Sequence, residues 1–196
     1  MTTALTVRKA NKPAFYRRGL SHYYPSLPDY ISYQEAHAIL EATQGNIRDY
    51  LLIACMWYAG LRISEALSLT PNSIRGQDFR ILGKGGKERF VPVKQSLVND
   101  LLQYALAYKK AYNDRFFSIT RSQAHRILNS YAQKAGLQRK VHCHLLRHGY
   151  AVNLLKQCPN LVYLQELLGH SSIETTRIYT RAAMPDIRQA LENVEM

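Results

Sequence analysis

The chain has 196 residues, 46% of them hydrophobic and 20% charged, a globular composition that excludes a mostly disordered chain. It contains no apolar run near the ~20 residues of a membrane span, no apolar signal core and only three cysteines. We therefore expect a cytoplasmic protein without a disulfide framework. Lysine and arginine number 26 against 14 acidic residues, a net charge of +12 that favours a polyanionic partner, most often nucleic acid.

The first 28 residues are basic, lack any acidic residue and are interrupted by prolines. We interpret residues 1–28 as a basic, partly extended arm and residues 29–196 as the compact domain. The arm either contacts nucleic acid or is a solvated terminus. Its candidate contact residues are Arg8, Lys9, Lys12, Arg17 and Arg18.

The elements of the compact domain are predicted mainly from apolar spacing and helix-boundary residues. Ser32 and Glu35 form a capping-box pattern that predicts a helix start, and Gly45 is expected to end that helix. Residues 46–59 are apolar at helical spacing, with Ile47, Leu51, Ala54 and Tyr58 on one face. A short helix over 64–67 follows Gly60, and residues 78–93 predict a β-hairpin with its turn at 83–86.

Helices are then predicted near 96–112, 121–135, 144–157, 160–168 and 184–194, with Asn160 capping the fourth of them. The predicted fold class is mainly α (α+β), with one small antiparallel β-sheet.

Six residues, which are basic apart from one tyrosine, occur at spacings that suit a reaction at a phosphate. Gly60 precedes Arg62, and glycines flank Lys84. His144 and Arg147 are three residues apart and so share a helical face, whereas His170 follows a predicted helix end, nine residues before Tyr179. Such cations and imidazoles can stabilise a pentacoordinate phosphorane while a phenolate attacks the phosphorus atom. No carboxylate pair or cluster suggests a metal, and we predict no cofactor.

Four segments that contain these residues resemble the signature segments of a known family, in the same order. They are GLRISEALSL, LGKGGKERFVPV, HLLRHGYAVNLL and LQELLGHSSIETTRIYT. They are similar to the tyrosine recombinases of the phage integrase family, the lambda-integrase-like and Xer-type enzymes. The resemblance covers about residues 30–185.

The resemblance implies a site-specific DNA recombinase that needs neither ATP nor a metal. Tyr179 attacks a DNA phosphate to give a 3′-phosphotyrosyl intermediate, Lys84 protonates the departing 5′ oxygen, and strands exchange through a Holliday junction. His144 assists proton transfer to and from the tyrosine, and Glu65 buttresses the arginines as a structural residue. The residues that hold the non-bridging oxygens are Arg62, Arg147 and His170.

The resemblance also implies double-stranded DNA as the partner and a homo-tetramer on DNA. The helix near 184–194 docks on a neighbouring subunit or packs on its own domain. We further expect accessory DNA-bending or DNA-binding proteins and no membrane partner. The expected location is the nucleoid, and the expected origin is a bacterium, phage or plasmid. Family members usually carry a separate N-terminal DNA-binding domain, so the chain is either a short single-domain recombinase or a catalytic-domain fragment.

Two alternative functions use the same fold. One is a DNA-binding regulatory module without productive recombination, and the other is topoisomerase IB-like strand relaxation. Lys87 and Arg89 in the predicted hairpin are interpreted as phosphate contacts or solvated charges, and His148 as a packing or supporting residue. Tyr150 and Tyr163 are rival nucleophiles whose contexts do not match the family pattern.

Overall fold

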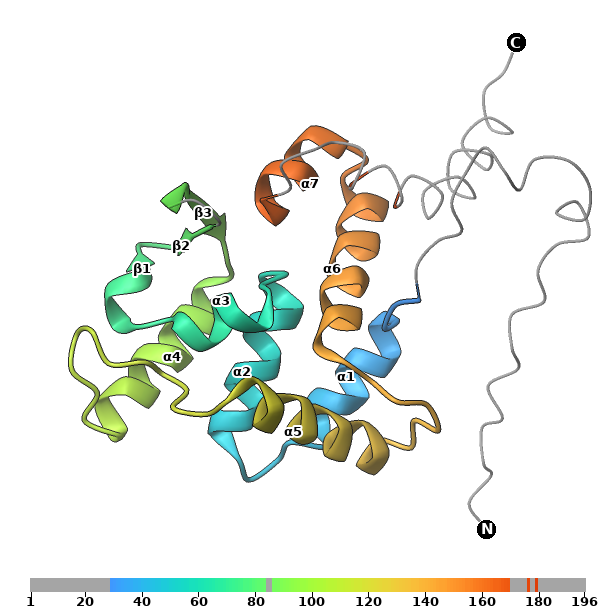
Figure 1. The fold of residues 1–196 in the computed structure, drawn as a ribbon, viewed down its shortest axis with the longest axis horizontal. Helices are drawn as coiled ribbons and strands as arrows, with labels where there is room; N and C mark the ends of the chain where they lie inside the picture. Colours follow the sequence, from blue (N-terminus) through green and yellow to red (C-terminus); the bar gives the residue numbers. More distant parts are fainter. Residues whose placement is uncertain (1–28, 84–85, 170–175, 177–178, 180–196) are drawn as a thin grey trace, which may run out of the picture.

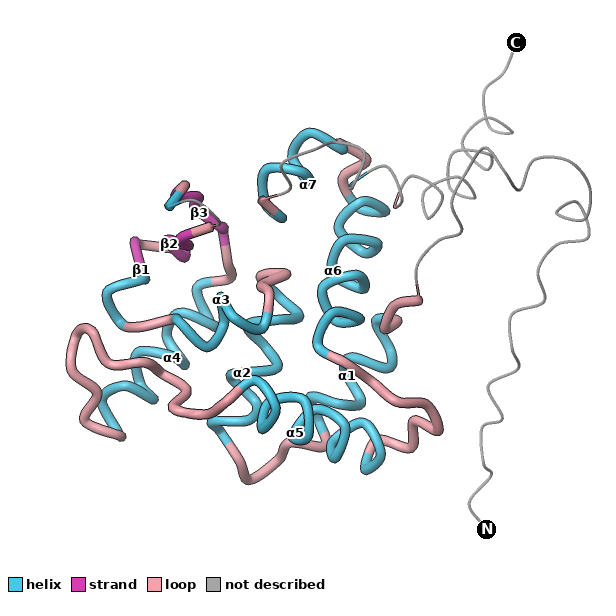
Figure 2. The backbone as a smooth tube through the Cα atoms, in the orientation of Figure 1, coloured by secondary structure: helices cyan, strands magenta, loops and turns pink. Residues whose placement is uncertain are grey.

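A computed structural model describes residues 29–83 and 86–169 together with Thr176 and Tyr179 (Figure 1). Residues 1–28, Lys84, His170 and the helix predicted near 184–194 lie outside the described residues. The described part is mainly helical with one small sheet, as predicted (Figure 2). Its elements are α1 (Tyr33–Glu41), α2 (Ile47–Tyr58), α3 (Ile63–Ser68), a 3₁₀ turn (Pro71–Ser73), β1 (Ile74–Arg75), β2 (Asp78–Leu82), β3 (Glu88–Pro92), α4 (Gln95–Ala107), α5 (Arg121–Lys134), α6 (Cys143–Gln157) and α7 (Leu161–Leu168).

Helix α2 lies at the centre of the helical part and contacts α1, α3, α4 and α6 (Figure 1). Every side chain from Leu51 to Trp57 is buried. The predicted helix is confirmed, and along this stretch it is covered on all sides rather than on a single face. Ile47, on the predicted apolar face, is 44% exposed at the first turn. A helix surrounded by others carries apolar residues all round, so periodicity does not identify its buried face.

The predicted helix starts are confirmed more closely than the predicted ends. Ser32 and Glu35 form the capping box of α1, with each side chain bonded to the other's backbone N–H. Helix α1 ends at Glu41, and Gly45 adopts a positive φ of 86° in the turn beyond it. Helix α4 ends at Ala107, five residues before the predicted end.

The sheet is antiparallel in the order β1-β2-β3 and confirms the predicted hairpin. Phe79 is paired with Val91 and Ile81 with Arg89. Phe79, Ile81 and Val91 are buried, whereas Phe90 points to the other face and is exposed, as the two-residue period of a strand requires. Strand β1 was not predicted, because two residues at a sheet edge leave no periodic signal.

Helix α7 contacts both α6 and β3, and so links the sheet to the helical part. The side chain of Asn160 caps α7 by accepting hydrogen bonds from two backbone N–H groups, as predicted. Gly169 ends the helix in the left-handed conformation at a φ of 62°. A second apolar cluster forms between these two helices, and it includes Tyr179. Within the described ranges, no helix is long and apolar enough to cross a membrane.

Candidate active site

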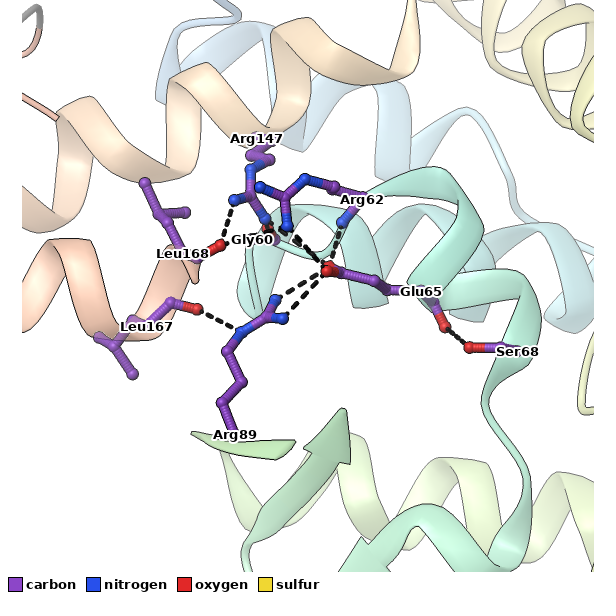
Figure 3. A network of polar contacts seen from close by, with 8 residues as sticks. All are labelled: Gly60, Arg62, Glu65, Ser68, Arg89, Arg147, Leu167 and Leu168. Atoms are coloured by element: carbon purple, nitrogen blue, oxygen red, sulfur yellow. Dashed lines mark hydrogen bonds and ion pairs between the residues drawn. The ribbon is translucent and has the colours of Figure 1, made fainter. Parts of the chain in front are cut away.

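The carboxylate of Glu65 is the centre of a network of arginines (Figure 3). Glu65 lies in the first turn of α3, where its Oε2 accepts a 2.8 Å hydrogen bond from the backbone N–H of Arg62. The Arg62 guanidinium donates to Oε1 over 2.9 Å. Arg89, on strand β3, donates to both carboxylate oxygens over 3.0 and 2.9 Å. Glu65 therefore orients the arginines, which supports the structural role expected for it.

Arg89 has a role that the sequence analysis did not anticipate. Besides its two bonds to Glu65, its Nε donates to the carbonyl oxygen of Leu167 over 3.0 Å. Its side chain is only 12% exposed. Each of its three guanidinium nitrogens donates to a protein oxygen, so Arg89 is not a solvated charge in the structure. It joins the hairpin to the end of α7, whereas Lys87, two residues earlier, is exposed.

Arg147, on α6, is 1% exposed and is held by backbone oxygens on two sides. It donates to the carbonyl of Gly60 over 2.7 Å and to the carbonyl of Leu168. Gly60 has a positive φ of 59°, and a β-carbon there would overlap the ring of Tyr150. The glycine therefore permits both the turn and the close approach that bring its carbonyl to Arg147.

The network carries an excess of positive charge. Arg147 lies 3.7 Å from the Glu65 carboxylate, so three guanidiniums of the described residues face one carboxylate. Burial would raise the pKa of Glu65, but the hydrogen bonds from Arg89 and Arg62 and the charges of Arg89 and Arg147 outweigh it and lower that pKa. Glu65 is therefore ionised at neutral pH, and about two positive charges remain uncompensated, which suits a phosphate.

Arg62 and Arg147 are brought together at the end of α7. Both guanidiniums donate to the carbonyl oxygen of Leu168, the Arg62 bond being 3.4 Å long. Burial and, after it, the charge of Arg62 lower the pKa of Arg147 to about 10, so the group stays charged at neutral pH. Arg62 is the more accessible of the two, since its side chain is 37% exposed.

Tyr179 is 1% exposed, and its phenol oxygen lies 2.5 Å from Nδ1 of His148 on α6. Burial raises the pKa of Tyr179 to about 12, although the charges of Arg147 and Arg62 act in the opposite direction. The phenol is therefore protonated at neutral pH. Its attack on phosphorus requires that its proton be removed.

His144, one helical turn before His148, is exposed and does not share a hydrogen bond with Tyr179 in the structure. Its ring lies edge-on to that of His148, with 4.6 Å between the centroids. Loss of solvation around its ring lowers the pKa of His144, and the charges of Arg147, His142 and Arg62 also lower it. The His144 imidazole is thus neutral at pH 7.

The two rival tyrosines differ in position. Tyr163 is exposed on α7, whereas Tyr150 packs against Gly60 and against the apolar cluster that includes Tyr179. Burial raises the pKa of Tyr150, although the charge of Arg147 acts in the opposite direction. Lys84 and His170 lie outside the described residues, so of the six predicted catalytic residues the structure places Arg62, His144, Arg147 and Tyr179. Among the described residues, no group of three or more His, Cys, Asp or Glu side chains is arranged to hold a metal ion.

The contacts of two residues in this site were not predicted from the sequence. Arg89 was interpreted as a phosphate contact or a solvated charge, and His148 as a packing or supporting residue. The available signal for His148 was its spacing of four from His144, which places both on one side of a helix. For Arg89 the signal was the strand alternation that directs it, like Ile81 opposite, toward the covered face of the sheet.

Comparison with known proteins places this geometry in a family. The model of the phage integrase family matches residues 29–185. A tyrosine recombinase of Pseudothermotoga lettingae is 33% identical over 160 residues, covering 78% of this chain and 56% of the relative. The tyrosine recombinase XerD of Corynebacterium glutamicum is 34% identical, covering 83% of this chain and 60% of the relative. The chain thus spans about three fifths of the length of these relatives.

Solved structures agree. The crystal structure of XerA recombinase matches with a TM-score of 0.74 at 28% identity, covering 87% of this chain and 68% of that one. The XerH site-specific recombinase bound to its difH substrate, in a pre-cleavage complex, matches with a TM-score of 0.71 at 28% identity, covering 79% of this chain and 50% of that one. With four signature segments, an arginine network around Glu65 and a buried tyrosine, this chain belongs to the phage integrase family of tyrosine recombinases.

Proposed function

We propose that this chain breaks and rejoins DNA strands in site-specific recombination, with Tyr179 as the nucleophile. The observation that carries the proposal is the position of Tyr179. Its phenol is buried where the charges of Arg147 and Arg62 act on it, and those two guanidiniums meet at one carbonyl. The excess positive charge there suits the extra negative charge of a phosphorane.

In the proposed reaction, Arg62, Arg147 and His170 bind the non-bridging oxygens of the scissile phosphate. Guanidinium forks match phosphate oxygens geometrically, and they stabilise the transition state more than the ground state because negative charge accumulates there. The Tyr179 oxygen forms a bond to phosphorus as the bond from phosphorus to the 5′ oxygen breaks. Lys84 donates a proton to that departing oxygen.

The product of the first step is a 3′-phosphotyrosyl ester and a free 5′ hydroxyl. A 5′ hydroxyl from a second strand then attacks the ester, expels Tyr179 and reseals the DNA. Because the energy of the phosphodiester is retained in the ester, resealing needs no nucleotide hydrolysis. His144 assists the movement of protons to and from the tyrosine.

We further propose that the chain acts on double-stranded DNA as a homo-tetramer through a Holliday junction. The candidate contact residues outside the catalytic centre are those of the basic arm, over 1–28, and Lys87. Sedimentation of the protein on a two-site DNA tests the assembly, since strand relaxation by a topoisomerase-like enzyme needs no tetramer.

The test of the proposed chemistry needs DNA that the protein selects. Bound sequences are enriched from a random or genomic pool and rebuilt as nicked suicide duplexes, from which the cleaved end dissociates. These are incubated with wild-type protein and with Tyr179→Phe, and a detergent-resistant protein–DNA adduct is sought. We expect an adduct with the wild type alone, and equal DNA binding by both. An adduct with Tyr179→Phe, or binding by the wild type without any adduct, would contradict the proposal.

A further inference from the structure

The nucleophile and one imidazole are in direct contact. Nδ1 of His148 lies 2.5 Å from the phenol oxygen of Tyr179, and the two ring centroids are 5.6 Å apart. His148 projects from α6, while Tyr179 belongs to the apolar cluster between α6 and α7. A buried phenol is stabilised by a hydrogen-bond partner, and this imidazole is the one that the described residues provide.

The protonation states define the direction of the hydrogen bond. Burial, the largest cause, and the charges of His144, Arg147 and His142 together lower the pKa of His148 to about 4, whereas Asp29 acts in the opposite direction. The imidazole is therefore neutral at pH 7, and the phenol is protonated. The phenol donates to Nδ1, so the imidazole proton is on Nε2. This tautomer can receive a second proton.

We propose that His148 is the general base of the cleavage step and accepts the phenolic proton of Tyr179 on Nδ1. The proposal rests on the proposed function. As the oxygen–phosphorus bond forms and the bond to the 5′ oxygen breaks, the proton passes from the phenol to Nδ1. The 5′ oxygen receives its proton from Lys84. In the resealing step, His148 returns its proton to the departing phenolate.

The charge of the substrate makes this weak base competent. In the DNA-free protein, an imidazolium at this position is repelled by the neighbouring cations, so His148 stays neutral. A bound phosphate brings negative charge to the same place, and the phosphorane brings more. Opposite charge favours the protonated imidazole and raises its pKa toward neutrality. The base therefore gains strength only when a phosphate is bound, and Tyr179 is not ionised without DNA.

The geometry distinguishes His148 from His144. His144 is exposed and lies edge-on to the His148 ring rather than at the phenol. It can pass protons between His148 and solvent, which is consistent with the assisting role proposed for it. The first acceptor of the phenolic proton is nevertheless the imidazole that touches the phenol.

The experiment isolates proton removal from leaving-group protonation. The selected duplex carries sulfur in place of the 5′ bridging oxygen at the scissile phosphate, because a thiolate leaves without a proton. Single-turnover adduct formation is followed from pH 6 to 9 with wild type, His148→Asn, His148→Ala and His142→Ala. Asparagine keeps an oxygen near the place of Nδ1 that can accept a hydrogen bond but not a proton. His142→Ala removes an exposed imidazole from the residue before α6 and is the matched control.

We expect adduct formation at pH 7 to fall about 10²–10⁴-fold in both His148 variants and to stay near the wild-type rate in His142→Ala. Across the pH range, the wild-type rate should be nearly flat. The variant rates should rise about tenfold per pH unit, because hydroxide must then remove the proton. The slope is measured within each variant, so a smaller folded fraction does not produce it.

The assignment of His148 as the general base would be overturned if both variants kept the pH dependence of the wild type, or if either cleaved faster. The hydrogen bond between His148 and Tyr179 would then only hold the tyrosine in its resting position. Absence of an adduct with the wild type would instead overturn the proposed function itself. The two failures are thus distinguishable.

Discussion

Replacing Glu65 by glutamine tests whether this carboxylate holds the arginines together. In the structure Glu65 is buried and accepts hydrogen bonds from Arg62 and Arg89, with Arg147 3.7 Å away. Glutamine has nearly the same shape, but it is neutral and its amide nitrogen donates. One of the two oxygens that accept hydrogen bonds from Arg89 is then replaced by an NH₂ group, which faces an N–H of Arg89 and cannot accept from it.

The expected magnitude follows from the charges that remain. Removing one partner of a buried ion pair leaves an uncompensated buried charge and costs about 3–5 kcal/mol. Here three guanidiniums lose their counter-charge, but Arg62 is partly solvated, so we expect about 3 kcal/mol. A domain of this size has a free energy of unfolding of about 5–15 kcal/mol, so the loss is large but leaves a folded protein.

The assay is urea unfolding followed by circular dichroism, with Glu88→Gln as the control. Glu88 lies next to Arg89 on β3, and its ion pair with Arg80 is 3.7 Å long and partly exposed. Its loss should cost less than about 1 kcal/mol. The pKa of Glu65 is lowered in the folded state, so its contribution is complete above about pH 4.5 and decreases as the pH falls through the folded-state pKa. The acid sensitivity below pH 4.5 should therefore be smaller in Glu65→Gln.

Binding to a short DNA duplex separates the effect on affinity from the effect on stability. Because the variant has one negative charge fewer near Arg62 and Arg147, its DNA affinity should not fall when it is measured without urea, where the variant is folded. Glu65 does not hold the arginines together if Glu65→Gln and Glu88→Gln destabilise the protein equally. The same follows if Glu65→Gln stays within about 0.5 kcal/mol of the wild type, as surface substitutions do.

Three further predictions concern separate features of the molecule. Gly60→Ala should destabilise the protein by about 2 kcal/mol or more in urea unfolding, because φ is positive there and the added β-carbon overlaps Tyr150. Gly45 also has a positive φ but open space around it, so Gly45→Ala should cost only about 1 kcal/mol. Equal losses would contradict the overlap with Tyr150. The pKa of His148 is lowered to about 4, so the unfolded chain binds a proton that the folded protein does not, and stability should fall as the pH decreases from about 6.5 toward 4. In His148→Asn this fall in stability should be about 1–2 kcal/mol smaller, and an unchanged fall would contradict the lowered pKa of His148. Arg62→Ala should reduce the slope of log affinity against log salt by about one, measured by fluorescence anisotropy, and an unaltered slope would argue against a phosphate contact.

Local signals predicted the elements that depend on local chemistry. The capping box of Ser32 and Glu35 and the cap at Asn160 are bonds within one turn, so residue type and spacing indicate them. The hairpin over 78–93 was also indicated, because strand alternation and a glycine turn are both readable in the sequence. The two-residue strand β1 and the exposure of Ile47 depend on packing against distant segments.

The site was predictable as a set of residue types but not as a set of contacts. Arg89 and Glu65 are 24 residues apart, and only the fold shows that their side chains meet. Similarly, His144 and His148 lie on one side of α6, and the packing of Tyr179 between α6 and α7 determines which of them reaches the phenol. Sequence pattern therefore identified the family and its chemistry, whereas the pairing of groups came from the structure.

If Tyr179 is the nucleophile, it becomes covalently attached to DNA. The most direct measurement is to trap the wild-type protein on its selected suicide duplex in the presence of EDTA, digest the adduct with protease and nuclease, and locate the modified residue by mass spectrometry. We expect a nucleotide joined through its 3′ phosphate to the peptide that contains Tyr179. Attachment to Tyr150, Tyr163 or any other residue, or through a 5′ phosphate, would contradict it.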